Sequence, residues 1–121
     1  MSTLRLVQRG EVYLARLDPV EGSEQGGRRP VIIVTRDAIN RNSRLVVVVP
    51  CTTHRADRRV FPSQVLLTAP DGGLNRDSVA MGEQVRSLAV TRLLTRLGLL
   101  SPSALARVER ALLIALDLPT P

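Results

Sequence analysis

The segment Glu21–Pro30, EGSEQGGRRP, combines residue types that a simple turn does not need. It contains three glycines, two acidic residues and two adjacent arginines directly before a proline. A hairpin connection needs only about two to five residues, so the segment is longer than chain reversal requires. A guanidinium offers donors in a fixed fork that suits phosphate, and glycine lets a ligand approach the backbone closely. The segment therefore favours a functional loop.

The basic residues of the chain are all arginines. The formal net charge is +6, and none of the 17 basic residues is a lysine. Arginine binds phosphate with two parallel hydrogen bonds and stacks on bases, so this composition raises the odds of a polyanionic partner. A genome rich in G and C would produce the same bias. Composition by itself therefore leaves nucleic-acid binding open.

A second arginine-rich segment, His54–Arg59, follows the motif Cys51-Thr-Thr53. It is either an exposed polar loop or a basic rim that faces a single strand, and the rim is favoured because single strands need a positive track. His54 is the side chain whose ordinary pKa suits a general base at neutral pH. Aromatic residues make up only 2% of the chain. Base stacking is therefore expected on arginine planes, and not on an aromatic platform.

Metal and redox chemistry find little support in the sequence. The single cysteine, Cys51, excludes an internal disulfide and a multi-cysteine metal site, and its place after a valine run predicts a buried thiol. Asp18, Glu21 and Glu24 are not expected to bind a metal, because nothing forces their oxygens to converge, and all but Glu24 are interpreted as a solvated loop face. We expect no metal and no cofactor. Neither a signal peptide nor a membrane-length apolar run is visible, so the expectation is a cytoplasmic protein with no membrane association.

The elements that must position these residues are mostly strands. Apolar runs bounded by glycine, proline and aspartate predict strands. Pro62 has no amide hydrogen to donate, so it indicates either an edge strand or a position at the start of its strand. Ser78–Leu88 predicts one or two further short strands, Asp71–Gly73 a turn, and Val90–Leu100 either a helical turn or a strand. The four clearest strands are Glu11–Leu17, Val31–Thr35, Leu45–Val49 and Phe61–Leu67.

The C-terminal part changes to a helical period. Ser101 is predicted as the N-cap of a helix over Ser101–Leu116, with Pro102 at its first position. One apolar stripe is expected to pack on the sheet, formed by Leu105, Val108, Leu112 and Leu116. With strands first and one helix last, residues 1–121 are predicted to form a single β-dominated α+β domain, a small barrel capped by the helix.

Several motifs in this order resemble the MazF/PemK family of toxin endoribonucleases. The GSEQGxRP signature is the most specific of them, and the similarity spans nearly the whole chain. The matching segments are Arg9–Tyr13, Gly22–Pro30, Pro50–Thr53, Asp77–Met81, Gly82–Ser87 and Gly98–Pro102.

The resemblance implies a twisted SH3-like barrel with a C-terminal helix, which agrees with the elements predicted above. It also implies a homodimer that cuts single-stranded RNA such as mRNA at short sequences without a metal. The partner of such a toxin is a cognate antitoxin, which neutralises it by laying an acidic segment into the RNA groove.

Carried over by position, the resemblance implies that Arg29 and Thr52 are the catalytic pair. Pro30 disfavours the helical region for Arg29 and holds it extended. Arg28 falls at a variable position and is expected to contact phosphate. His54 is expected to contact RNA, with a catalytic role as its alternative. The full set of expected RNA-binding residues is Ser23, Glu24, Gln25, Gly26, Arg28, Thr53, His54, Arg58, Gln84 and Arg86.

A second class of function stays open at this point. Toxins related by fold inhibit a protein target such as DNA gyrase, and these non-catalytic proteins need no Arg29/Thr52 pair. The glycine-rich segment and Thr52 favour the nuclease.

Overall fold

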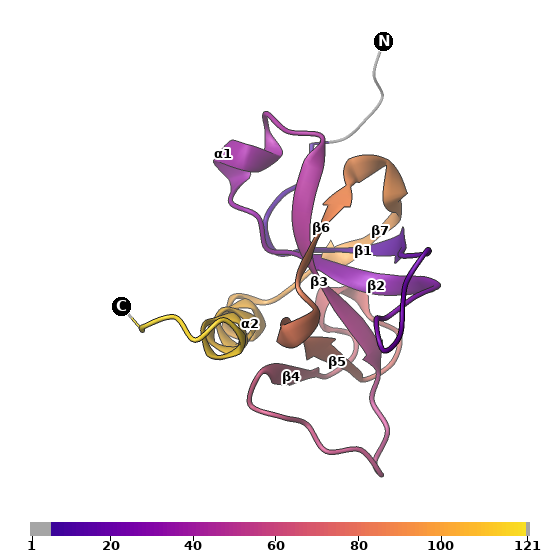
Figure 1. Cartoon of the computed structure of the whole chain (residues 1–121), viewed down its shortest axis with the longest axis vertical. Coiled ribbons are helices and arrows are strands. Elements are labelled where there is room, and N and C mark those ends of the chain that lie inside the picture. The colour runs from indigo at the N-terminus through magenta and orange to yellow at the C-terminus, as the bar shows by residue number, and fades with distance from the viewer. Residues whose placement is uncertain (1–5, 121) are drawn as a thin grey trace.

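The computed structural model describes residues 6–120 and consists of one seven-stranded antiparallel sheet with a C-terminal helix (Figure 1). The strand order is β4-β5-β3-β2-β1-β7, and β6 also pairs with β3. A short helix, α1 (Asp37–Asn40), connects β2 to β3. The strands are β1 (Glu11–Arg16), β2 (Arg28–Ile33), β3 (Leu45–Thr53), β4 (Gln64–Leu67), β5 (Ser78–Met81), β6 (Arg86–Ala89) and β7 (Leu93–Leu99).

The β-dominated α+β class is confirmed, but the sheet does not close into a barrel. Strands β4 and β7 form its two ends, and no ladder joins them within residues 6–120. The sheet is instead strongly twisted (Figure 1). The small twisted barrel predicted from the sequence is therefore an open, twisted sheet in the structure.

Strand β3 is longer than predicted and organises the whole sheet. It continues past Val49 through Pro50 to Thr53. Its first half pairs with β6 and its second half with β5, while β2 runs along its middle. Strand β2 also begins earlier than predicted, at Arg28. Both arginines before Pro30 consequently belong to a strand and have fixed positions relative to β3.

The later elements settle the alternatives that the sequence left open. The region Ser78–Leu88 forms two strands, β5 and β6, separated by a 3-10 turn over Gly82–Gln84. A second 3-10 turn, Val90–Arg92, leads into β7, so the ambiguous region is mainly a strand. The strand predicted at Phe61–Leu67 shortens to β4, because Phe61 and Pro62 still belong to the preceding loop.

Aliphatic side chains fill both faces of the sheet, as the low aromatic content predicted. On one face, Val12, Ile32 and Val49 pack together with residues of the C-terminal helix. On the other face, Val31, Ile33 and Val48 pack with Tyr13 and neighbouring aliphatic residues. Cys51 is fully buried in the first of these clusters, and burial raises the pKa of its thiol to about 12. The predicted buried thiol is thus confirmed.

Helix α2 (Pro102–Ala115) lies against β4 and the 82–84 turn (Figure 1). The Ser101 hydroxyl accepts from the Ala104 amide at 3.3 Å, which confirms the predicted N-cap. The apolar stripe is centred on Val108, flanked by partly buried Leu105 and Leu112. Leu116 does not belong to this stripe, because the helix ends before it and its side chain is exposed. Within the described range, no helix is long and apolar enough to cross a membrane.

Candidate active site and RNA-binding clefts

Arg29 and Thr52 lie next to each other on two adjacent antiparallel strands. The register of β2 and β3 pairs Val31 with Pro50. Arg29 precedes Val31 by two residues and Thr52 follows Pro50 by two residues. In an antiparallel pair, the same register therefore brings Arg29 opposite Thr52. The Arg29 Nη1 atom donates to Thr52 Oγ1 at 3.1 Å. Both side chains are partly buried, so this contact is shielded but still open to a ligand.

The glycine-rich loop between β1 and β2 holds the other side of the Arg29 guanidinium. Arg29 Nε donates to the carbonyl of Gly26 at 2.7 Å. A Cβ at position 26 would lie 2.6 Å from the Asp18 carboxylate, and Gly27 has a φ of +72°. The Asp18 carboxylate in turn accepts from the Gly27 amide at 3.0 Å. The two glycines are therefore needed for the backbone position that orients Arg29.

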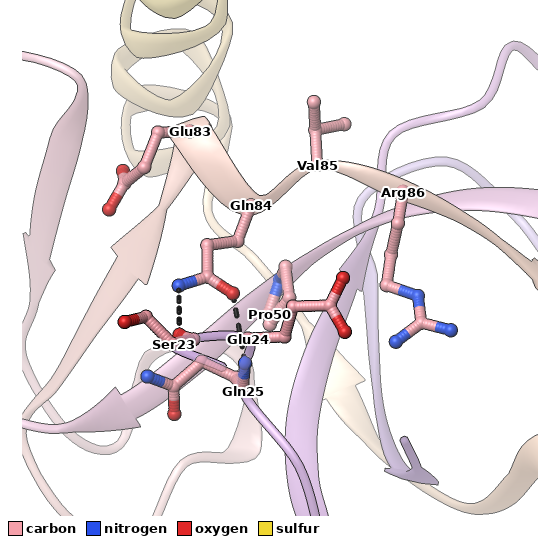
Figure 2. Close-up of a pocket in the computed structure, with 8 residues that line it drawn as sticks. All are labelled: Ser23, Glu24, Gln25, Pro50, Glu83, Gln84, Val85 and Arg86. Atoms are coloured by element: carbon pink, nitrogen blue, oxygen red, sulfur yellow. Dashed lines mark hydrogen bonds between the residues drawn. The ribbon is translucent and has the colours of Figure 1, made fainter. Parts of the chain in front are cut away.

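Gln84 fastens this loop to the 82–84 turn. Its Oε1 accepts from the Gln25 amide at 2.9 Å, and its Nε2 donates to the Ser23 carbonyl at 3.2 Å. Figure 2 shows both bonds and shows Gln84 and Arg86 pointing from their own segment toward the side on which the loop lies. Because both ends of the amide are used, Gln84 fixes the conformation of the backbone that precedes Gly26.

Between the loop and the 82–86 segment lies the larger of two clefts near the pair. Its volume is about 520 Å³. Arg86 contributes a guanidinium to it, and one of its nitrogens donates to the Leu17 carbonyl at 3.4 Å. The remaining donors of Arg86 can reach an anion in the cleft. The lining residues are Ser23, Glu24, Gln25, Pro50, Glu83, Gln84, Val85 and Arg86.

A second, smaller cleft of about 130 Å³ begins on the other side of Gln25. Thr52 opens onto this second cleft, and Gln25 lines both. Its outer wall comes from the predicted basic rim between β3 and β4. The lining residues are Gln25, Thr52, Thr53, Arg55, Arg58, Arg59, Val60, Phe61, Gln64, Val79 and Met81.

Strand alternation separates the predicted site residues into two groups. Successive side chains of a strand project from opposite faces of the sheet. Arg29 and Thr52 therefore project from one face, whereas Arg28 and Thr53 project from the other. Thr53 accordingly also lines a third cleft, of about 230 Å³, together with Arg76. Among the predicted arginines of β2, Arg28 is thus directed away from the Arg29–Thr52 pair.

His54 stands just beyond the end of β3. Its amide donates to the Asp77 carbonyl at 2.8 Å and so extends the pairing of β3 with β5. Its Nδ1 atom is buried without a hydrogen-bond partner among residues 6–120, and His54 lines neither of the two clefts beside Thr52. The geometry gives the Arg29–Thr52 pair a better position for chemistry than His54.

The acidic residues of the loop serve its own folding. Asp18 binds the Gly27 amide, and the Glu24 carboxylate accepts from the Glu21 amide at 2.7 Å. Glu24 also lines the larger cleft. In the part of the chain that the structure describes, no group of three or more His, Cys, Asp or Glu side chains is placed to hold a metal ion.

The structure adds functional candidates that the sequence analysis did not select. Phe61 lines the smaller cleft beside the predicted basic rim, and Arg92 donates to the carbonyls of Arg16 and Asp18, which anchors the start of the glycine-rich loop. Phe61 had a usable signal, because it is the single phenylalanine of the chain and follows an arginine-rich segment. Arg92 had none, since its partners are backbone atoms 74 and 76 residues away.

The arrangement suits binding and polarising a phosphodiester. A guanidinium has five N–H donors, of which Arg29 spends one on Gly26 and one on Thr52 within the described structure. The other three are available to phosphoryl oxygens. Because Thr52 Oγ1 accepts from Arg29, its own hydrogen is free to be donated elsewhere. Two donors on facing strands thus share one anion-binding position between two clefts.

This fold and site define a small toxin of a toxin–antitoxin system. Residues 8–116 match the family model described as the PemK-like, MazF-like toxin of type II toxin–antitoxin systems. Since the match covers most of the chain, the protein belongs to this family.

Three relatives show the extent of the similarity. The chain is 40% identical over 118 residues to the endoribonuclease MazF9 of Mycobacterium tuberculosis, covering 93% of this chain and 98% of the relative. It superimposes with a TM-score of 0.77 on a mycobacterial endoribonuclease solved with its cognate antitoxin, at 31% identity over 95% of this chain and 99% of that one. It also matches MazF from Deinococcus radiodurans, with a TM-score of 0.78 and 26% identity over 93% and 98% of the two chains.

Proposed function

We propose that this protein is a sequence-specific, metal-independent endoribonuclease that cuts single-stranded RNA, including mRNA, as the toxin of a type II toxin–antitoxin system. Membership of the toxin family and the 40% identity to an endoribonuclease support the activity. The observation that carries the proposal is the cross-strand contact between Arg29 and Thr52, because Thr52 also lines the smaller cleft at the end of β3.

The proposed reaction uses the RNA's own 2′-hydroxyl as the nucleophile. Its oxygen attacks the adjacent phosphorus in line and gives up its proton to water, and the bond from phosphorus to the 5′-oxygen of the next nucleotide breaks as that oxygen takes a proton from water. The products are a 2′,3′-cyclic phosphate and a free 5′-hydroxyl. Negative charge grows on the phosphoryl oxygens during this step. Catalysis therefore requires preorganised donors aimed at those oxygens.

Arg29 supplies the charge for this step. Guanidinium stays protonated under ordinary conditions, so Arg29 acts by electrostatic stabilisation and not as a base. Its bonds to Gly26 and Thr52 hold it before substrate arrives, which avoids reorganisation during the reaction. Thr52 donates its hydroxyl hydrogen to a phosphoryl oxygen. The two side chains together form the catalytic pair.

The RNA-binding residues divide by location. Arg86 and Gln25 border the larger cleft, where Ser23 and Glu24 also offer polar groups to the strand. Arg58 borders the smaller cleft and contributes to its positive rim. Arg28, on the opposite face of β2, contacts a phosphate farther along the RNA. The remaining contacts come from Gly26, Thr53 and His54, whereas Gln84 acts through the loop that it holds.

The proposed partners are a cognate antitoxin and a second copy of the chain. An acidic antitoxin segment would occupy the arginine-lined clefts and exclude RNA by competing for the same donors. A homodimer is implied by the family resemblance, and light scattering on the purified protein would measure its mass directly. The proposed location is the cytoplasm, where the mRNA substrate is present.

Incubation of the purified protein with a long single-stranded RNA in excess EDTA tests this function. We expect discrete fragments whose 3′ ends carry a cyclic phosphate. Arg29→Ala protein from the same preparation route controls for contaminating nucleases. Intact RNA would contradict the proposal and favour an inhibitor of a protein target such as gyrase, the other class of toxin with this fold.

A further inference from the structure

The smaller cleft has an aromatic wall that the catalytic pair does not use. Phe61 is 50% exposed although it is the single phenylalanine of the chain. The Arg59 guanidinium carbon lies 5.3 Å from the centre of the Phe61 ring, so the cation covers part of the ring. Half of the Phe61 side chain is therefore open to solvent at the cleft, where an aromatic ligand could stack on it.

The rest of the cleft is built for a flat, mostly apolar group with polar edges. Its deeper lining includes the buried side chains of Val79 and Met81. Gln25 and Gln64 supply amide groups at its sides. The cleft thus combines one aromatic wall and a few apolar side chains with amides and arginines, which suits a nucleobase and the phosphate next to it. A volume of about 130 Å³ has no space for a longer segment of RNA.

The backbone around Phe61 is fixed before any ligand binds. The Phe61 amide donates to Gln64 Oε1 at 3.1 Å, and Gln64 Nε2 donates to Glu83 at 2.7 Å. Glu83 is the neighbour of Gln84, which holds the loop that carries Arg29. One turn therefore supports both the aromatic wall and the catalytic loop, so the distance between them is set by the fold.

We propose that the Phe61–Arg59 pair is the stacking platform of a specificity subsite that binds the base of one nucleotide next to the cut phosphate. This inference rests on the proposed endoribonuclease function. Thr52 connects the two, because it lines the cleft and also contacts Arg29. The platform differs from the sequence-based expectation that stacking would use arginine planes alone.

The test combines removal of the base with removal of the ring. The cut site is first mapped in a long RNA. Short RNAs are then made with 2′-deoxyribose at the cut site, so that they bind without being cleaved, and with an abasic residue on either side of it. Binding of each RNA is measured to wild type and to Phe61→Leu, which keeps an apolar side chain but has no aromatic face.

We expect base removal on one side of the cut to weaken binding to wild type by roughly 5- to 100-fold, the range of base stacking on an aromatic residue. The same removal should have little further effect on Phe61→Leu, because the interaction is already lost. Phe61→Trp should restore the dependence on the base. Leu66→Ala, an exposed apolar residue outside this cleft, is the matched control and should behave like wild type.

Two results would overturn the inference. In the first, base removal weakens RNA binding to Phe61→Leu by the same factor as it weakens binding to wild type, at both positions. The ring then contacts neither base. If Phe61→Trp fails to restore the dependence while remaining folded by thermal unfolding, stacking is not the interaction. Absence of RNA cleavage by wild type would remove the proposed function itself, which distinguishes the two failures.

Discussion

The Arg29 guanidinium donates to the Thr52 hydroxyl at 3.1 Å across two antiparallel strands. This contact follows from the register that pairs Val31 with Pro50, so it is built into the sheet and does not depend on a flexible loop alone. The glycine-rich loop adds a second bond to the guanidinium through the Gly26 carbonyl. Sites that are held by strands are more accurately positioned than sites on loops. The pair is therefore preorganised for phosphate.

Replacing Arg29 by alanine should abolish cleavage and leave the protein folded. The guanidinium supplies the positive charge at the phosphate. Among the described residues, no other guanidinium donates to both the Gly26 carbonyl and the Thr52 hydroxyl. Loss of such a group removes at least roughly two to three powers of ten in turnover. Cleavage of a short RNA would be measured under single-turnover conditions, and circular dichroism would report folding. Turnover close to that of wild type would show that the charge comes from elsewhere.

Arg28→Ala is the matched neighbour and should behave differently. It should weaken RNA binding and reduce the slope of log affinity against log salt by about one, because one phosphate contact is lost. Turnover should remain measurable, since Arg28 projects from the opposite face of β2. Binding would be titrated at several salt concentrations. If Arg28→Ala lost turnover and Arg29→Ala lost only binding, the assignment of the two arginines would be reversed.

Gln84→Ala should lower kcat more than it raises KM. Without the amide, the Gln25 and Ser23 backbone loses both anchors and the Gly26 carbonyl no longer holds Arg29 in one place. Misplacement of a catalytic group by about 1 Å costs as much as roughly a hundredfold. Faster hydrogen exchange of the loop amides should accompany the loss.

Two further variants separate this positioning role from direct RNA binding. Gln84→Glu keeps an acceptor for the Gln25 amide but loses the donor to Ser23, so its kcat should be intermediate. Glu83→Gln, on the same turn, should leave loop exchange unchanged because Glu83 contacts Ser63 and Gln64 instead. A pure KM effect in Gln84→Ala would show that its amide acts on RNA and not on the loop.

Asp71→Asn should destabilise the junction between the 71–73 turn and α2 in a pH-dependent way. Burial raises the pKa of Asp71, but hydrogen bonds from the Ser101 hydroxyl and amide more than offset this, so the pKa lies below the usual 3.8. A lowered folded pKa contributes stability above the unfolded pKa, and this stability is lost as the pH falls through the folded value. The charge should therefore stabilise the fold at neutral pH.

The measurement is urea unfolding of wild type and Asp71→Asn at about pH 7 and near pH 3. We expect the free energy of unfolding to fall by about 1–2 kcal/mol at neutral pH, as for hydrogen bonds to a charged group. The difference should shrink at the acidic pH, which lies below the ordinary pKa of 3.8, because the unfolded chain then binds the proton more readily than the folded one. Asp57→Asn, in an exposed loop, serves as the control. A difference that is constant with pH would show that the charge of Asp71 does not matter.

The resemblance nominated Arg29 and Thr52 as the catalytic pair, and the structure adds that the two side chains contact each other. The glycine-rich signature and Pro30 marked Arg29, and the end of the valine run marked Thr52, because each lies in a locally readable pattern. Their pairing could not be read from the sequence, since it depends on the register of β2 and β3. The contacts of Gln84 were equally hidden, because its partners are 59 and 61 residues away.

The errors in the fold have similar physical causes. The predicted strand at Val31 began too late because two arginines do not look like strand residues, although pairing with β1 makes them so. Leu116 fits the helical period, but the helix ends one residue earlier and leaves it exposed. No ladder joins β4 to β7 within the described residues. Closure of a sheet depends on the twist and length of its edge strands, and composition does not encode these properties.

The central claim is that Arg29 and Thr52, and not His54, carry the reaction, and single-turnover cleavage by Thr52→Val and His54→Gln tests it most directly. Thr52→Val keeps the shape of the side chain and removes its hydroxyl, so we expect a fall in rate of roughly one to three powers of ten. Binding of an RNA with 2′-deoxyribose at the cut site should change little. His54→Gln should cleave at a rate close to wild type. A crippled His54→Gln beside a near-normal Thr52→Val would contradict the claim and make histidine the proton carrier.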